Sequence, residues 1–149
     1  MLRPGAACPD FSLPDATGTP VDPRALRGKP FVLFFYPKDD TPGCTAEACA
    51  FRDDYGSFVE AGAEVFGISS DDGTSHARFA GRHGLPFRLL SDAGGAVRRA
   101  FGVPATLGVL PGRATFVIDA NGTVVYAFNA QFLPKAHVVG ALAALRAAS

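Results

Sequence analysis

The sequence predicts an α/β fold in which a central mixed sheet is flanked by helices. Between residues 31 and 101, apolar segments of strand character alternate with segments of helical periodicity, which is typical of parallel strands covered by helices. Farther along, Asn121-Gly122 separates two apolar segments and is the strongest hairpin signal in the chain. The hairpin adds antiparallel strands to the parallel ones. With 149 residues, no internal repeat and no linker, we expect one domain over residues 1–149.

The first 30 residues predict an extension that precedes the central strand. Residues 4–14 read as extended chain, with Phe11 and Leu13 on one side. Turn residues within 15–22 predict a small N-terminal hairpin. Residues 23–27 then predict one helical turn, which Gly28 ends.

Three strands follow, and each is followed by a helix. The expected strands cover residues 31–36, 63–69 and 87–90, and the expected helices cover residues 42–60, 74–83 and 96–101. Ser91 or Asp92 is suited to cap the last of these helices. Apolar residues at helical spacing are expected to face the sheet, namely Ala48, Phe51, Tyr55, Phe58 and Val59, and then Ala77, Phe79 and Ala80.

The C-terminal part predicts the hairpin and a closing helix. Glycine and proline make residues 102–112 irregular. Strands are expected over residues 113–119 and 123–128, on either side of Asn121-Gly122. Residues 134–147 form an alanine-rich helix with one apolar face, which carries Val138, Leu142 and Leu145.

Composition excludes several classes of protein. The formal charge is zero, so no broad electrostatic attraction to nucleic acid or to an anionic membrane is expected. No window of 18 apolar residues predicts a transmembrane helix, and the first residues lack the apolar core of a signal peptide. Three cysteines do not suit a secreted disulfide framework. A reducing cytoplasm is therefore the expected location.

Cys44 is the main candidate for chemistry. It follows Pro42-Gly43, which places it in the first turn of a helix that begins where a buried strand ends. Free backbone N–H groups and the partial positive charge of the helix start, including the N–H of Gly43, favour the nucleophilic thiolate and can orient a bound substrate. Thr41 offers a hydroxyl to the sulfur or to a bound oxygen, and Pro37 stiffens the loop. The alternative is a small structural thiol packed beneath the helix.

Cys49 lies five residues beyond Cys44. On an ideal helix the two Cα atoms are roughly 8–9 Å apart and on different faces. A disulfide needs a Cα separation below about 7 Å. The two thiols therefore cannot pair while the helix is intact, and the spacing suits a redox switch that requires local unwinding.

The segment from Phe31 to Asp54 resembles the peroxiredoxins, and is most similar to the bacterioferritin-comigratory or peroxiredoxin Q subgroup. The family signature Pro-x3-Thr-x2-Cys matches Pro37, Thr41 and Cys44. The subgroup adds a cysteine five residues on and the run Glu-Ala-Cys-x-Phe-Arg-Asp, which is present from Glu47 to Asp53. Two weaker matches extend the resemblance: an N-terminal Pro-Asp-Phe-x-Leu, and Arg-Ala-Thr-Phe from Arg113, where the family usually has Arg-Ser-Thr-Phe.

This resemblance implies a thioredoxin-like fold and a thiol-dependent peroxidase that needs no metal, haem or flavin. Cys44 would reduce hydrogen peroxide and organic hydroperoxides and become a sulfenic acid, while Pro37 limits access of water and further oxidant. Cys49 would resolve the sulfenic acid as an intramolecular disulfide. Thioredoxin or a similar dithiol protein would then restore both thiols. The subgroup further implies a monomer.

Other residues carry competing interpretations. Arg113 is expected to approach the thiolate or a peroxide oxygen, the alternative being an exposed cation at a strand end. Glu47 lies one turn beyond Cys44 and is a candidate to orient Arg113, or else part of a solvated helix face. Cys8 is expected to be structural, with a redox role as the alternative. The three histidines, His76, His83 and His137, lack the paired spacing of a zinc site.

The sequence leaves two rival functions open. A disulfide reductase on the same scaffold is disfavoured, because the sequence lacks Cys-x-x-Cys. A redox sensor or holdase would use oxidation of Cys44 to change binding. Peroxide consumption driven by a thioredoxin system separates these functions from a peroxidase.

Overall fold

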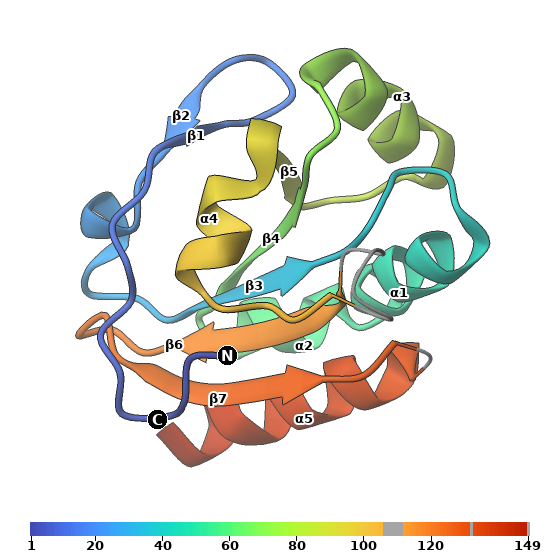
Figure 1. Cartoon of the computed structure of the whole chain (residues 1–149). Coiled ribbons are helices and arrows are strands. Elements are labelled where there is room, and N and C mark those ends of the chain that lie inside the picture. Colours follow the sequence, from blue (N-terminus) through green and yellow to red (C-terminus); the bar gives the residue numbers. More distant parts are fainter. Residues whose placement is uncertain (106–111, 132, 149) are drawn as a thin grey trace.

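The computed structural model describes residues 1–105, 112–131 and 133–148, and within them a five-stranded mixed sheet forms the centre (Figure 1). The strands stand in the order β5-β4-β3-β6-β7. Their bounds are β3 (Phe31–Phe35), β4 (Glu64–Ser69), β5 (Arg88–Ser91), β6 (Ala114–Ile118) and β7 (Val124–Asn129). β3, β4 and β5 are parallel, whereas β6 runs antiparallel to both β3 and β7. The predicted mixed sheet of the α/β class is confirmed.

The remaining elements pack on the two faces of this sheet, and β1 and β2 among them form a separate two-stranded sheet. The helices are α1 (Pro42–Asp53), α2 (Tyr55–Glu60), α3 (Gly73–His83), α4 (Ala96–Ala100) and α5 (Pro134–Ala148). The expected N-terminal hairpin forms from β1 (Leu13–Pro14) and β2 (Pro20–Val21), and a 3-10 turn, η1 (Pro23–Leu26), follows it. A second 3-10 turn, η2 (Ala93–Gly95), precedes α4. Among the described residues, no helix has the length and apolar character needed to span a membrane.

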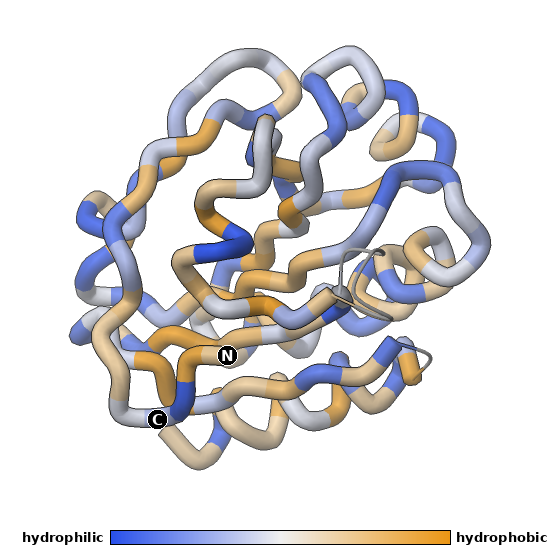
Figure 2. Tube along the Cα trace, in the orientation of Figure 1, coloured by the Kyte–Doolittle hydropathy of each residue, from blue (hydrophilic) through white to orange (hydrophobic). Residues whose placement is uncertain are grey.

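Alternation along β3 divides the interior into two cores. Val32, Phe34 and Tyr36 pack on the face that α1, α2, α3 and α5 cover. Phe31, Leu33 and Phe35 pack on the other face, with α4 and the N-terminal segment. Every residue of β3 is buried, as expected of a strand covered on both faces. Figure 2 shows the same pattern, with hydrophobic residues along the central strands and hydrophilic ones in the outer loops.

The predicted helix over residues 42–60 is instead two helices, so this expectation was wrong in part. Asp54 interrupts it with φ −103° and ψ 13°. Asp54 and Gly56 are weak helix formers, and the break changes the helical phase that follows. Phe58 stays buried against Phe51, with ring centroids 5.6 Å apart. Val59, which was expected to face the sheet, is 54% exposed.

Three further segments, α3, the start of α4 and the hairpin turn, bear on local expectations. On α3 Phe79 is buried and Ala80 is half-buried against the core, as expected, whereas Ala77 is exposed and His76 is buried instead. Asp92 accepts hydrogen bonds from the backbone N–H groups of Val97 and Arg98 and thereby caps α4. The hairpin turns at residues 119–123, with Gly122 at φ 81°. Part of the irregular segment 102–112 lies outside the described residues.

Candidate active site

The loop from β3 to α1 places Cys44 in the first turn of α1. Pro42 is the first residue of the helix, which suits its fixed φ and missing N–H, and Thr41 is the N-cap. Phe34 of β3 stacks on Phe51 of α1 with ring centroids 4.5 Å apart, which fixes the helix against the sheet. The Cys44 thiol is 1% exposed, yet it contacts a guanidinium and is not enclosed by hydrocarbon alone.

Arg113 reaches Cys44 because β6 is antiparallel to β3. Phe35, at the end of β3, pairs with Ala114, at the start of β6, so Arg113 lies at the edge where α1 begins. Its Nη2 donates to Cys44 Sγ at 3.3 Å, its Nη1 to Glu47 Oε1 at 2.9 Å and its Nε to the Gln131 carbonyl at 3.1 Å. It is only 4% exposed, so the alternative of an exposed cation is wrong.

The charge of this guanidinium is supported by its partners. Burial works against the charged form, but Glu47 and Cys44 outweigh it and raise the pKa of Arg113 above its ordinary value. The side chain therefore stays a cation aimed at the sulfur.

Gly43 leaves room for the guanidinium. A Cβ at this position would lie 3.1 Å from Arg113 Nη2, the same nitrogen that donates to Cys44. That is closer than side-chain carbons normally approach a nitrogen. Glycine at this position therefore allows Arg113 to approach the first turn of α1.

Glu47 is fully buried, so its alternative reading as part of a solvated face is wrong. Burial raises the pKa of Glu47 to about 7, although the charge and hydrogen bond of Arg113 oppose the rise. Its Oε1 accepts from Arg113, whereas its Oε2 is buried without a hydrogen bond. That second oxygen lies 3.4 Å from His137 Nδ1. The structure thus brings Cys44, Arg113, Glu47 and His137 into one buried chain.

Of the two hydrogen bonds considered for the Thr41 hydroxyl, to the sulfur or to a bound oxygen, the one to the Cys44 sulfur does not form between these two described residues. Its hydroxyl donates to the Lys38 carbonyl at 2.8 Å. The hydroxyl oxygen keeps its lone pairs and can accept from a bound molecule. Pro37 is half-buried between Tyr36 and the loop, and its role in limiting access stays a prediction.

The three cysteines occupy different environments, and all three are free thiols. Cys49 is half-buried on α1, which continues unbroken from Cys44 past Cys49. Cys8 is buried in the core on the opposite face of the sheet from Cys44. Burial raises the pKa of Cys8 to about 11, so it is a neutral thiol at physiological pH. This environment favours the structural interpretation of Cys8.

Two neighbours of the site were missed by the sequence analysis. Arg98 of α4 donates to the carbonyls of Tyr36 and Gly112 at 2.9 and 2.6 Å. It therefore ties the segment before Pro37 to the segment before Arg113. Burial lowers the pKa of Arg98 below its ordinary value.

The second missed group is a buried network that holds the loop before Cys44. Asp39 accepts from the Tyr36 hydroxyl at 2.6 Å and lies 2.7 Å from His76 Nδ1. The other ring nitrogen of His76 lies 3.0 Å from the Leu90 carbonyl. Burial opposes its charge, but hydrogen bonds from His76 and Tyr36 lower the pKa of Asp39. This network anchors the loop that leads into α1.

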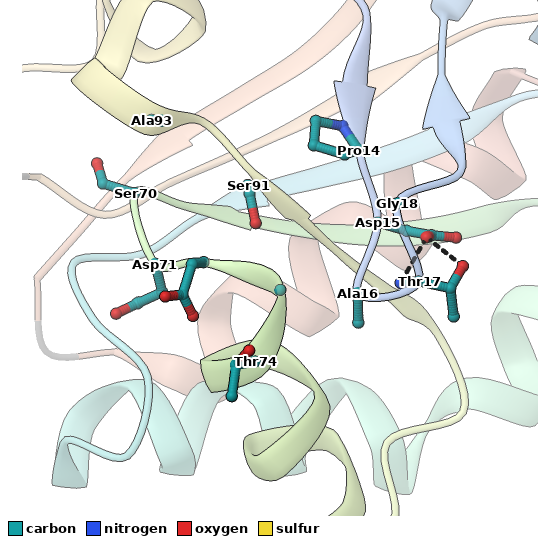
Figure 3. A pocket seen from close by; sticks show the side chains of 12 residues that line it. Pro14, Asp15, Ala16, Thr17, Gly18, Ser70, Asp71, Thr74, Ser91 and Ala93 are labelled. Carbon is teal, nitrogen blue, oxygen red and sulfur yellow. Dashed lines mark hydrogen bonds between the residues drawn. The ribbon is translucent and has the colours of Figure 1, made fainter.

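A cavity of about 530 Å³ lies elsewhere, beside the carboxyl ends of β4 and β5 (Figure 3). It does not include Cys44, Glu47 or Arg113 among its lining residues. Its carboxylates have structural partners: Asp15 accepts from Thr17, and Asp71 accepts from Ser69 and the Asp39 N–H. Across the described part of the chain, no group of three His, Cys, Asp or Glu side chains forms a metal site.

A buried cysteine in the first turn of a helix, held by an arginine that directly precedes a neighbouring antiparallel strand of a thioredoxin-like sheet, defines the peroxiredoxin class. The chain belongs to the AhpC/TSA family, whose model matches residues 4–127. It is similar to the putative chloroplastic peroxiredoxin Q of Oryza sativa subsp. indica, with 54% identity over 135 residues. That match covers 90% of this chain, which spans 62% of the length of the rice relative.

Solved structures of peroxiredoxins are similar to this chain in both sequence and fold. Peroxidoxin BcpB from Mycobacterium tuberculosis has a TM-score of 0.91 and 44% identity, and the match covers 100% of this chain and 99% of that one. The bacterioferritin comigratory protein of Xanthomonas campestris, described with an alkyl peroxide reduction activity, has a TM-score of 0.86 and 38% identity, with 99% and 97% covered. The predicted resemblance to the peroxiredoxin Q subgroup is confirmed.

Proposed function

We propose that the protein is a thiol peroxidase in which Cys44 reduces hydroperoxides. The observation that carries the proposal is the 3.3 Å contact between Arg113 Nη2 and Cys44 Sγ at the start of α1. A guanidinium and the helix start both stabilise a thiolate, the form that attacks peroxides. Membership of the AhpC/TSA family supports the same conclusion.

In the proposed reaction the Cys44 thiolate attacks one oxygen of the peroxide. The O–O bond breaks, the sulfur becomes a sulfenic acid, and the departing alkoxide or hydroxide takes a proton to leave as alcohol or water. Arg113 and the free N–H groups of the first turn stabilise the charge that builds on the oxygens. Thr41, whose hydroxyl already donates to Lys38, is left to accept a hydrogen bond from the peroxide O–H.

We propose Cys49 as the resolving residue. Both thiols lie on α1, and a disulfide between them requires the first turns of the helix to unwind. The Cys49 thiol then attacks the sulfenic acid, a disulfide forms and water leaves. A dithiol protein such as thioredoxin reduces this disulfide by exchange, which makes the enzyme an atypical two-cysteine peroxiredoxin.

The proposed substrates are hydrogen peroxide and organic hydroperoxides. The activity described for the Xanthomonas campestris relative supports the alkyl class. We further propose that the protein acts as a monomer in a reducing compartment such as the cytoplasm, where a dithiol reductant is available.

Peroxide consumption with a thioredoxin system, on the parent and on three single variants, tests this function. Cys44→Ser is expected to abolish turnover, and Cys49→Ser to allow one oxidation of Cys44 without recycling. Cys8→Ser is the matched control and is expected to keep the parent rate, since Cys8 lies in the opposite core.

Mass spectrometry after one equivalent of peroxide should find a Cys44–Cys49 linkage. Unaltered turnover of Cys44→Ser would refute the assignment, and absence of the linkage would refute the resolving step. Oxidation of Cys44 that changes binding without turnover would point to a redox sensor instead.

A further inference from the structure

His137 of α5 is a fully buried histidine whose ring nitrogens both meet polar atoms. Its Nε2 lies 2.7 Å from the Ala130 carbonyl oxygen. Because a carbonyl can only accept, Nε2 must carry a hydrogen. The protonation of the ring is therefore decided at Nδ1 alone.

Two oxygens face Nδ1. Thr115 Oγ1 lies 2.7 Å away and can donate or accept, while Glu47 Oε2 lies 3.4 Å away and makes no hydrogen bond. The Phe128 ring packs edge-on against the imidazole with centroids 4.8 Å apart. The Thr115 hydroxyl can donate to Nδ1, but an ionised Glu47 then keeps Oε2 buried without a donor, which is unfavourable. One proton held on Oε2 or on Nδ1 supplies the missing donor between these two atoms, and Thr115 can then accept instead of donate.

We propose that Glu47 and His137 share one buried proton, and that His137 is thereby a positioning residue that controls the ionisation of Cys44 through Glu47 and Arg113. When the pair holds its proton, Glu47 does not neutralise Arg113, and the full guanidinium charge faces the sulfur. When the proton is lost, an ionised Glu47 competes with Cys44 for the same guanidinium. Protonation of the pair and of Cys44 are therefore coupled.

The other charged groups around the pair are compatible with this coupling. Within the described residues, Arg113, which directly precedes β6, contacts Glu47 of the pair and also Cys44 of α1, and Arg98 of α4 interacts electrostatically with Cys44 and Arg113. The pKa of Glu47, raised to about 7 by burial, agrees with a carboxyl that keeps a proton near neutrality. Burial lowers the pKa of His137, so its ring resists becoming a separate cation.

The inference rests on Cys44 as the reacting thiol, but its test measures ionisation and needs no turnover. The ultraviolet absorbance of the thiolate is followed against pH in reduced protein that carries Cys8→Ser and Cys49→Ser, so that Cys44 is the one thiol observed. Glu47→Gln should lower the midpoint of Cys44 ionisation by about one pH unit, because it removes the competing negative charge. His137→Asn should raise the midpoint by about one pH unit, because an amide holds no extra proton and favours ionised Glu47.

The double variant Glu47→Gln/His137→Asn tests whether His137 acts through Glu47. In the Glu47→Gln background, His137→Asn should cause no further shift, because the carboxylate through which it acts is gone. His83→Asn, which removes an imidazole at the end of α3, is the matched control and should leave the midpoint unchanged. Equal shifts by His137→Asn in both backgrounds, or no shift in either, would overturn the proposal.

A measurement on the unsubstituted chain covers the case in which a variant does not fold. Nuclear magnetic resonance of protein with 15N-labelled histidine should show the His137 ring signals changing over the pH range in which Cys44 ionises. Ring signals that stay constant through that range would overturn the proposal. Coupled titration in a protein that consumes no peroxide would refute the proposed function and leave this inference standing.

Discussion

Replacing Arg113 by lysine separates the geometry of the guanidinium from its charge. Arg113 uses three nitrogens on three partners, namely Cys44, Glu47 and the Gln131 carbonyl. One ammonium group cannot hold all three in this arrangement. The lysine keeps a positive charge beside Glu47, so the variant does not leave an unpaired carboxylate in the core.

The expected magnitude follows from the contact to the sulfur. A hydrogen bond to a charged group contributes about 1.5–3 kcal/mol, which corresponds to about 10–150-fold in rate. The same nitrogen is aimed at the site where charge develops, and losing one such donor typically reduces rates about 100-fold or more. We therefore expect kcat/KM for the peroxide to fall about 100-fold in Arg113→Lys. The KM for the dithiol reductant should not change, because that step follows oxidation of Cys44.

Stopped-flow peroxide consumption with a saturating dithiol reductant measures this effect. Arg24→Lys is the matched control, because Arg24 is exposed and pairs with Asp22 on the N-terminal turn. It should retain the parent kcat/KM, and circular dichroism should show both variants folded. A folded Arg113→Lys variant within about threefold of the parent would show that the guanidinium does not stabilise the reacting charges.

Three further predictions concern the packing and the charges around α1. Gly43→Ala should lower kcat/KM about tenfold in the same assay, because its Cβ displaces Arg113 Nη2, whereas Gly56→Ala, with open space around it, should not. Asp39→Asn should lower the free energy of unfolding at pH 7 by about 3 kcal/mol in urea titrations. In the parent the stability contributed by ionised Asp39 is present above the unfolded pKa of about 4 and is lost as pH falls through the depressed folded pKa. The free energy of unfolding of the variant should therefore change less as the pH is lowered. The pH dependence of stability that Glu47 contributes has the opposite sign, since its folded pKa of about 7 lies above the unfolded value. The free energy of unfolding should therefore fall as the pH rises from about 4.3 to 7, and Glu47→Gln should flatten that profile.

The sheet and the position of Cys44 were predictable because they depend on local patterns. Six successive apolar residues from Phe31, followed by Pro42-Gly43-Cys44, encode a buried strand and a helix start. The proximity of Arg113 was implied by the family resemblance rather than by spacing. Its physical cause is the antiparallel register of β6 on β3, which one-dimensional periodicity cannot reveal.

Expectations failed where tertiary contacts override helical periodicity. A continuous 3–4 pattern through residues 42–60 does not show that Asp54 leaves the helix and changes its phase. On α3, His76 lies three residues before Phe79 and shares its buried face. The spacing was visible in the sequence, but a histidine is not ordinarily counted as part of an apolar face.

His137 is a second buried histidine on a helix face, and its ring nitrogens need polar partners. It precedes Ala141 and Leu145 at intervals of four residues, and all three are buried on α5, so the helical pattern alone places an imidazole in the core. A buried imidazole needs a partner for each ring nitrogen, and the Ala130 carbonyl satisfies only one of them. The second nitrogen meets Thr115 and the unpartnered oxygen of Glu47. A buried histidine on an otherwise apolar helix face therefore predicts buried polar partners for its ring nitrogens. In this fold one of them is Glu47, the carboxylate that holds Arg113 against Cys44.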